Sequence, residues 1–249
     1  MKSRFKLLLI LSILAVITTA CSPSLVRRST PKPDSQIPVI EAFELAPFTK
    51  IDIEAAGPII LIQGNTHAIQ IEGLQNVVKD ITFEVRDGVL VIKHSNTIWD
   101  WITERDFPTI TITFKNLTHF NQQGGSELVA NNLQSESLSM VMRGGASVNI
   151  SDLQVNTFML QVEGGAHINI SGTAASQTAS FQGGSNYDAE ELRSDSVRLK
   201  IEGVVSATVW ATELLDLDLN GAYDVKYYGS PSLTQSIKGV GSVESMGDK

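Results

Sequence analysis

The stretch LSMVMRGGASVNI at residues 138–150 decides the fold, because a close copy, FMLQVEGGAHINI, follows at residues 158–170. Each stretch alternates apolar and polar residues, turns at a pair of glycines and then alternates again. Alternation of this kind is typical of a strand with one buried face. A repeat of about twenty residues predicts a stack of similar strand pairs, each packed only on its neighbours.

The glycine turn recurs seven times after residue 123, with a period of 17 to 20 residues. Its positions are Gly124 and Gly125, Gly144 and Gly145, Gly164 and Gly165, Gly183 and Gly184, Gly203 and Val204, Asn220 and Gly221, and Gly239 and Val240. We interpret these glycines as structural turns, because glycine accepts positive φ and needs no room for a Cβ. A phosphate-binding glycine loop would need a helix after it, whereas strands are predicted here.

The two halves of the predicted β protein differ in regularity. Residues 39–118 alternate strongly without repeating, and Arg86-Asp87-Gly88 predicts a hairpin turn. The segment 99–107 interrupts the alternation and is expected to be a loop. In the repeats, leucines that follow the second strand could fill a third side of the coil; they are Leu133, Leu153, Leu192 and Leu214. The predicted fold is therefore all-β: a right-handed β-helix or β-solenoid-like stack of short strands, preceded by a less regular antiparallel half.

Composition narrows the class of protein. The chain has 249 residues, of which 42% are hydrophobic and only 6% aromatic. Its formal net charge is −8, which disfavours nucleic acid as a partner. The single cysteine rules out an internal disulfide, and no Cys/His cluster is present to hold a structural metal. We expect no metal and no cofactor.

The first residues predict export. Three basic residues precede an apolar run over 7–17, and small residues then lead to Cys21, which is the layout of a signal peptide. This end resembles a bacterial lipobox, in which the cysteine is lipidated; the alternative is an ordinary signal peptide that leaves Cys21 as a free thiol. We predict a signal peptide over 1–21, a flexible linker over 22–38, a β half over 39–118 and a repeat half over 119–249. The two halves are expected to form one continuous domain over 39–249.

Candidate chemistry is sparse in this sequence. Its four histidines are scattered, and Asp216 and Asp218 alternate with leucines, which is typical of a solvated strand face. No nucleophile elbow and no calcium-binding nonapeptide repeat is present. Aromatic residues that could stack on sugar rings occur in the later repeats and form the predicted binding surface. They are Tyr187, Trp210, Tyr223, Tyr227 and Tyr228.

These patterns resemble a bacterial family, the head GIN domain of auto-transporter adhesins. The resemblance rests on the segments 48–64 and 87–92 and on the Gly-Gly-Ser/Ala copies that end at Ser126, Ala146 and Ala166. It covers residues from about 40 onward, and it implies secreted or lipid-anchored β-helical proteins of the cell envelope. Later copies depart from the pattern, with Val204, Asn220 and Val240 at glycine positions and Asp224 at an expected inward position.

Three functions are compatible with this sequence. The first is a non-catalytic, outer-membrane-anchored lipoprotein that acts in adhesion and binds a glycan or a protein through its outward strand faces. The second is an enzyme acting on polysaccharide, because β-helices also carry lyases and hydrolases. The third is a structural component of envelope assembly. A groove with clustered charged side chains from three successive repeats would favour the enzyme.

Overall fold

The computed structural model describes residues 37–95 and 107–249. These residues contain one short helix, α1 (Gln75–Val78), and eleven strands. The strands are β1 (Pro38–Glu44), β2 (Lys50–Glu54), β3 (Gly57–Gln63), β4 (Ala68–Leu74), β5 (Ile81–Arg86), β6 (Val89–His94), β7 (Thr109–Phe114), β8 (His119–Gln123), β9 (Ser126–Asn131), β10 (Gln134–Tyr228) and β11 (Ser232–Ser245). The predicted signal peptide with Cys21, most of the predicted linker and most of the expected 99–107 loop lie outside the described residues.

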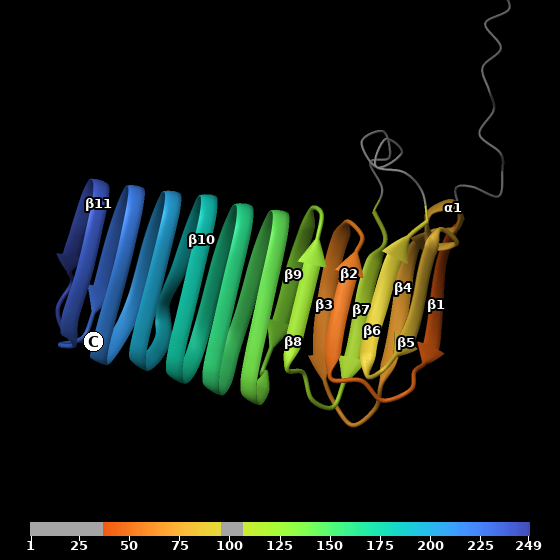
Figure 1. Ribbon diagram of the computed structural model, residues 1–249. Helices are drawn as coiled ribbons and strands as arrows, with labels where there is room; N and C mark the ends of the chain where they lie inside the picture. Colours follow the sequence, from red (N-terminus) through yellow and green to blue (C-terminus); the bar gives the residue numbers. More distant parts are fainter. Residues whose placement is uncertain (1–36, 96–106) are drawn as a thin grey trace, which may run out of the picture. The chain divides into compact units, whose positions relative to one another are not determined.

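The strands form one open sheet of mixed orientation, in the order β1-β4-β7-β3-β9-β10-β8-β2-β6-β5, with β11 on β10. The all-β prediction is therefore confirmed; the right-handed β-helix or β-solenoid stays a prediction. Figure 1 shows β10 winding back and forth through the repeats as side-by-side passes of one continuous ribbon. We call one pass of the chain through a corner, with the strand before the corner and the strand after it, a rung.

The first glycine of each pair makes the corner. Positive φ angles, from +114° to +150°, occur at Gly124, Gly144, Gly164, Gly183, Gly203, Gly221 and Gly239. From Gly144 onward, a Cβ added at any of these corners would lie only 2.0–2.7 Å from the carbonyl oxygen of the corner glycine one rung earlier. At the second glycines such a Cβ meets nothing closer than ordinary van der Waals contact: Gly145 and Gly184 have no atom within 4 Å, and the nearest atom lies at 3.6 Å for Gly165 and 3.9 Å for Gly125. Corner geometry therefore constrains one residue per rung, and Gly145 and Gly165 are not the strained positions.

The register of the last rungs differs from the sequence interpretation. Gly221 stacks directly on Gly203, and Gly239 stacks on Gly221, so Gly221 is the first residue of its corner and Asn220 precedes it. The expectation that Asp224 occupies an inward position is wrong for the same reason. Its neighbours Tyr223 and Val225 point inward, and the Asp224 carboxylate accepts a hydrogen bond from the Ser242 hydroxyl at 2.7 Å.

Parallel pairing extends into the N-terminal half, where antiparallel strands were expected. β2 pairs in parallel with β6 and β8, and β3 pairs in parallel with β7 and β9. Gly57 has φ +120°, and its N–H donates to the Gly125 carbonyl at 3.0 Å, so β2 and β3 form a rung with a corner of their own. Antiparallel pairs are limited to β1–β4, β4–β7 and β5–β6. The expected hairpin at Asp87 and Gly88 joins β5 to β6, with positive φ at both residues.

The rung of β2 and β3 lies between two rungs that come later in the chain. On one side β6 and β7 pair with it, and on the other side β8 and β9 do. A column of backbone hydrogen bonds continues this order, since Thr118 N–H donates to Thr49 C=O and Ser139 N–H donates to Thr118 C=O, both at 2.8 Å. The N-terminal half is thus joined to the repeats by the same ladder that joins the repeats to one another.

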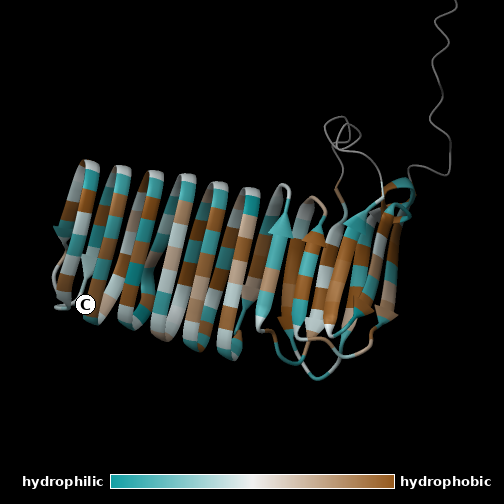
Figure 2. Ribbon diagram, in the orientation of Figure 1, coloured by the Kyte–Doolittle hydropathy of each residue, from teal (hydrophilic) through white to brown (hydrophobic). Residues whose placement is uncertain are grey.

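The core follows the alternation of the sequence, and Figure 2 shows hydrophobic and hydrophilic bands alternating along each rung. Most of its members are buried isoleucine, leucine, valine and alanine side chains that point between the passes of the chain. Leu133, Leu153 and Leu192 are buried, as expected for a third side, whereas Leu214 is 38% exposed. Leu214 pairs with Ser232 of β11, where no further described strand covers it.

Candidate functional site

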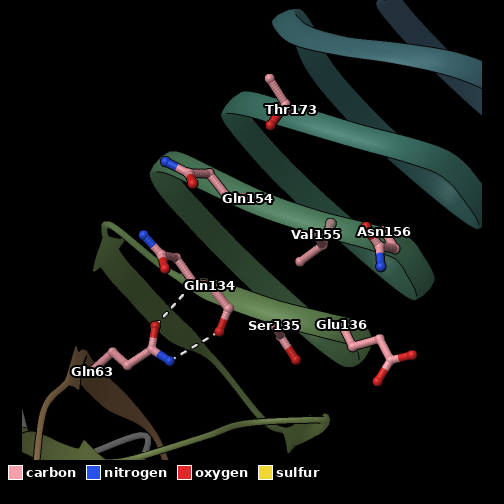
Figure 3. Close-up of a pocket in the computed structure, with 8 residues that line it drawn as sticks. All are labelled: Gln63, Gln134, Ser135, Glu136, Gln154, Val155, Asn156 and Thr173. Carbon is pink, nitrogen blue, oxygen red and sulfur yellow. Dashed lines mark hydrogen bonds between the residues drawn. The ribbon is translucent and has the colours of Figure 1, made fainter.

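A glutamine side chain closes the edge of the sheet at residue 134. Gln63 is the last residue of β3, and its Oε1 accepts a hydrogen bond from the Gln134 N–H at 2.7 Å. Its Nε2 donates to the carbonyl oxygens of Gln134 at 2.9 Å and Lys115 at 3.0 Å. Figure 3 shows the two bonds between Gln63 and Gln134. The side-chain amide therefore pairs with Gln134 as the peptide groups of a neighbouring strand would.

A polar hollow, which we call the notch, opens beside this pair and has a volume of about 570 Å³. Its lining residues are Gln63, Gln134, Ser135, Glu136, Gln154, Val155, Asn156 and Thr173. Amides and hydroxyls, which both donate and accept hydrogen bonds, make up most of this lining. Glu136 is its one charged residue and Val155 its one apolar residue. This set suits hydrogen bonding to a ligand better than proton transfer.

The notch lies beside three successive passes of the chain, because its lining comes from Gln63 and from residues 134–136, 154–156 and 173. Among the described residues, β10 pairs with β8 only over residues 139–143 and with β9 only over residues 146–151. Residues 134–137 precede both ranges. On the β8 and β9 side they face the segment 115–118: Gln63 Nε2 donates to both Lys115 C=O and Gln134 C=O, and the Ser135 hydroxyl donates to Asn116 Oδ1 at 3.4 Å. On the opposite side the next pass is in place, because Gln154 N–H donates to Leu133 C=O at 2.8 Å.

None of the eight lining residues was singled out from the sequence. A weak signal exists, since Gln134 and Glu136 recur as Gln154 and Asn156 at the same positions of the next rung. That recurrence marks a row of exposed polar side chains. The hollow beside it depends on which passes of the chain lie next to one another in space, and no local pattern reports that.

The predicted aromatic surface is wrong at two of its five positions. Tyr187 is fully buried and Tyr223 is 8% exposed, because both lie at inward positions of their strands. Trp210, Tyr227 and Tyr228 are half-buried. The alternation of Asn186, Tyr187 and Asp188 already places Tyr187 opposite to its polar neighbours, and that signal outweighs its aromatic character.

Tyr187 instead belongs to a polar network inside the core. The Gln177 side-chain amide donates to the Tyr187 hydroxyl at 2.6 Å, and the Ser194 hydroxyl donates to the Gln177 side-chain carbonyl at 2.9 Å. All three residues are at most 1% exposed. Burial raises the pKa of Tyr187 far above the usual range of a phenol, so the hydroxyl stays protonated. Such a satisfied buried network favours one register of the rungs.

Trp210 and Tyr228 are partly covered by Lys249. The lysine Nζ lies 5.6 Å from the Trp210 ring centroid and 4.8 Å from that of Tyr228. It also donates to the Glu190 carbonyl at 3.0 Å and pairs with the Glu191 carboxylate. Cation–π contacts and an ion pair together hold this end of the chain against residues 190–228. Two of the three rings that remain of the predicted surface, Trp210 and Tyr228, thus have an internal partner.

Replacing Lys249 with methionine should loosen β11. The change keeps the length of the side chain but removes the charge that Glu191, Trp210 and Tyr228 share, so we expect a loss of about 1 kcal/mol. Hydrogen exchange over residues 232–245 should become faster, while residues 138–170 keep their exchange rates. Lys226→Met is the matched control, since the Lys226–Asp224 pair is long, at 3.9 Å. Equal exchange in both variants would contradict a stabilising role for Lys249.

The sequence matches one family model over residues 47–231, that of the putative auto-transporter adhesin, head GIN domain. This match covers most of the chain. The chain belongs to the head GIN domain family. The family resemblance inferred from the glycine repeat is thereby confirmed. No curated protein matches the chain significantly.

Solved structures share this head GIN domain fold. A putative adhesin from Bacteroides fragilis is 28% identical, with a TM-score of 0.80 over 86% of this chain and 99% of its own. A putative lipid binding protein from Parabacteroides distasonis is 16% identical, with a TM-score of 0.63 over 84% and 96%. A putative adhesin from Parabacteroides merdae is 17% identical, with a TM-score of 0.61 over 84% and 96%. The last two support the fold alone.

Outside the notch, the described residues of the head GIN domain offer few candidate metal-binding or catalytic groups. Within residues 37–95 and 107–249, no group of three His, Cys, Asp or Glu side chains is placed to hold a metal ion. No helix in the same residues has the length and hydropathy needed to cross a membrane.

Burial, followed by the charge of Lys115, lowers the pKa of His67, which packs edge-on against Phe48 at 4.9 Å between ring centroids. The adhesin name of the family favours a non-enzymatic role.

Proposed function

We propose that this protein is an envelope lipoprotein whose β-solenoid head binds a surface ligand in adhesion, and that the notch is the binding site. The observation that carries the proposal is the polar lining of the notch, with amides and hydroxyls from β3 and from successive passes of β10. Clustered hydrogen-bonding groups of this kind give specificity to a binding surface. The family name and the adhesin neighbour at 28% identity support the same role.

The notch does not favour the alternative of a polysaccharide-acting enzyme. Glycoside hydrolysis needs two carboxyl groups about 5 to 10 Å apart, one on each side of the scissile bond. Glu136 is the single carboxylate in the lining, and the position that follows it on the next rung carries Asn156. The acidic or basic row that would favour an enzyme is absent from these eight residues.

A direct binding assay tests the adhesion role. The exported chain should bind at least one glycan or extracellular-matrix protein on an array. The double variant Gln154→Ala/Asn156→Ala should weaken that binding about tenfold, since two hydrogen-bonding side chains are lost. Ser147→Ala/Asn149→Ala changes two exposed polar residues away from the notch and is the matched control. Absence of any ligand, or an equal loss in both double variants, would contradict the proposal.

Fractionation tests the lipid anchor. We expect the wild-type protein in the membrane fraction and the Cys21→Ala variant in the soluble fraction, because acyl chains on Cys21 would supply the membrane affinity. Lys226→Met, with the cysteine intact, should fractionate as wild type does. If Cys21→Ala stays with the membrane, the protein is held there by something other than a lipid on this residue.

A further inference from the structure

We infer that Trp210, Tyr228 and Glu191 form a binding site for a primary alkylammonium group, and that Lys249 occupies this site as an internal ligand. We call the site the cage. None of its residues lines the notch, so the inference adds a second site to the proposed binding function. The ligand class is an alkyl chain that ends in –NH₃⁺, as a lysine side chain does. An external group of this kind would bind by displacing the side chain of Lys249.

Two aromatic rings form the walls of the cage. Trp210 and Tyr228 lie on successive passes of β10, and a Cβ added at Gly229 would lie 3.6 Å from Trp210 Cδ1. Both rings face one point, because the Lys249 Nζ lies 5.6 Å from the Trp210 centroid and 4.8 Å from the Tyr228 centroid. An ammonium within about 6 Å of a ring centroid is attracted by the negative face of the ring.

Two oxygen groups complete the cage and set its preference for N–H donors. Lys249 Nζ donates to the Glu190 carbonyl oxygen at 3.0 Å and forms an ion pair with the Glu191 carboxylate. A primary ammonium carries three N–H donors, so it can make both contacts while it lies over the rings. A quaternary ammonium has no N–H and could use the rings and the charge alone. The cage therefore favours a primary ammonium.

The bound ammonium is shielded from water more than the other cations in ion pairs. The Lys249 side chain is 23% exposed, whereas every other lysine or arginine in the ion pairs of the described residues is at least 42% exposed. Cation–π attraction strengthens when the cation loses water. This shielding distinguishes the cage from the exposed ion pairs on the strand faces.

The cage does not depend on Lys249 for its shape. Its rings and its carboxylate belong to β10, whereas Lys249 lies beyond β11 and in no strand. Other bonds hold the backbone near Lys249 in place, since Met246 N–H donates to Tyr227 C=O at 2.8 Å and Gly229 N–H donates to Gly247 C=O at 2.9 Å. The lysine side chain can therefore leave the cage while this backbone stays.

The test uses the exported full chain in detergent and n-butylammonium chloride as the probe. NMR follows the indole N–H signal of Trp210, which a Trp210→Phe spectrum assigns among the three tryptophans. We expect the signal to shift during titration of Lys249→Ala, in which the cage is open. Wild type should show the same shift at a probe concentration at least about tenfold higher, because the tethered lysine competes at a high effective concentration.

Matched probes and variants separate charge, donors and chain length. Both n-butyltrimethylammonium, which lacks N–H donors, and butan-1-ol, which lacks the charge, should bind Lys249→Ala at least about tenfold more weakly than n-butylammonium. Lys249→Ala/Glu191→Gln should also bind n-butylammonium about tenfold more weakly, because the carboxylate partner is lost. Lys249→Ala/Glu127→Gln changes an exposed carboxylate of β9 and should bind as Lys249→Ala does.

The peptide acetyl-Gly-Lys-Gly-amide identifies the source of the ammonium. If it shifts the Trp210 signal of Lys249→Ala, the cage accepts a lysine of a protein partner; if only n-butylammonium does so, the cage accepts free amines. Equal binding of butan-1-ol would overturn the inference. So would an unchanged Trp210 signal in a Lys249→Ala variant whose circular dichroism melt shows a folded protein; if that variant does not fold, the wild-type titration decides.

The cage and the proposed adhesion role fail separately. If the cage binds no ammonium, ligand binding through the notch on the array could persist, and the proposed function would stand. Loss of all array binding would instead remove the adhesion role, whatever the Trp210 signal does with n-butylammonium.

Discussion

Replacing Gly183 with alanine should destabilise the protein by about 3 kcal/mol or more. Gly183 has φ +126°, which an alanine adopts at a cost of about 1–3 kcal/mol. The new Cβ would also lie 2.2 Å from the Gly164 carbonyl oxygen, far inside van der Waals contact, and the backbone of both rungs would have to separate. Urea denaturation followed by circular dichroism measures the loss.

Gly184 is the matched control for Gly183. It is the adjacent residue, it shares the same corner, and an added Cβ would meet no atom within 4 Å. Gly184→Ala should change the free energy of unfolding by less than about 0.5 kcal/mol. Equal destabilisation in the two variants would show that the corner needs flexibility at both residues, and that stacking contact between corner glycines is not the cause.

Replacing Tyr187 with phenylalanine should have the second largest effect, a loss of about 1–3 kcal/mol. The variant keeps the ring that packs at 5.2 Å between centroids on Phe181, but it leaves the Gln177 amide without its acceptor inside the core. A buried donor with no partner costs about this much free energy. Thermal or urea unfolding of the two proteins gives the difference.

A double-mutant cycle isolates the network. Tyr187→Phe/Gln177→Leu removes both partners, and the Ser194 hydroxyl keeps a contact with Leu192 C=O at 3.4 Å. The double variant should therefore be more stable than the sum of the two single losses predicts, by about 0.5–3 kcal/mol. Additive losses would mean that Tyr187 and Gln177 act independently.

The pH dependence of stability gives a second readout for Tyr187. Its pKa is raised in the folded protein, mainly by burial, from a usual value of 10.0. The unfolded chain releases the phenol proton first, so this residue stabilises the fold equally at all pH values below about 10 and progressively less above it. Tyr187→Phe should accordingly lose less stability than wild type between pH 10 and pH 11.

Residue patterns predicted much of the fold because each pattern reports a local requirement. Alternation predicted the strands around Ile51, Ile59 and Val89, and the repeated glycines predicted corners. The antiparallel expectation for the N-terminal half is confirmed only for β1–β4, β4–β7 and β5–β6, because parallel pairing here also joins segments from distant parts of the chain, such as β2 with β8. Strand partners at such separations leave no periodic signal in one sequence.

Side-chain patterns predicted the candidate site less well. The five aromatics were grouped by residue type, but residue type does not decide whether a side chain is exposed. Tyr187 is buried because it lies at an inward position of its strand, and Lys249 covers part of Trp210 and Tyr228. The residues of the notch are ordinary polar residues on a solvated strand face. They become a candidate site because the end of β3 at Gln63 lies beside the start of β10 at Gln134, and these two residues are 71 positions apart in the sequence.

By itself the sequence determined that this protein is an all-β member of the head GIN domain family, with strands that alternate and corners that require glycine. Those features depend on φ preferences and on alternation within a few residues. Only the tertiary structure decided which glycine of each pair is strained, where the rung of β2 and β3 lies, and that polar side chains from three passes of the chain line the notch. Each of these depends on what lies one rung away, and that neighbour is set by long-range pairing.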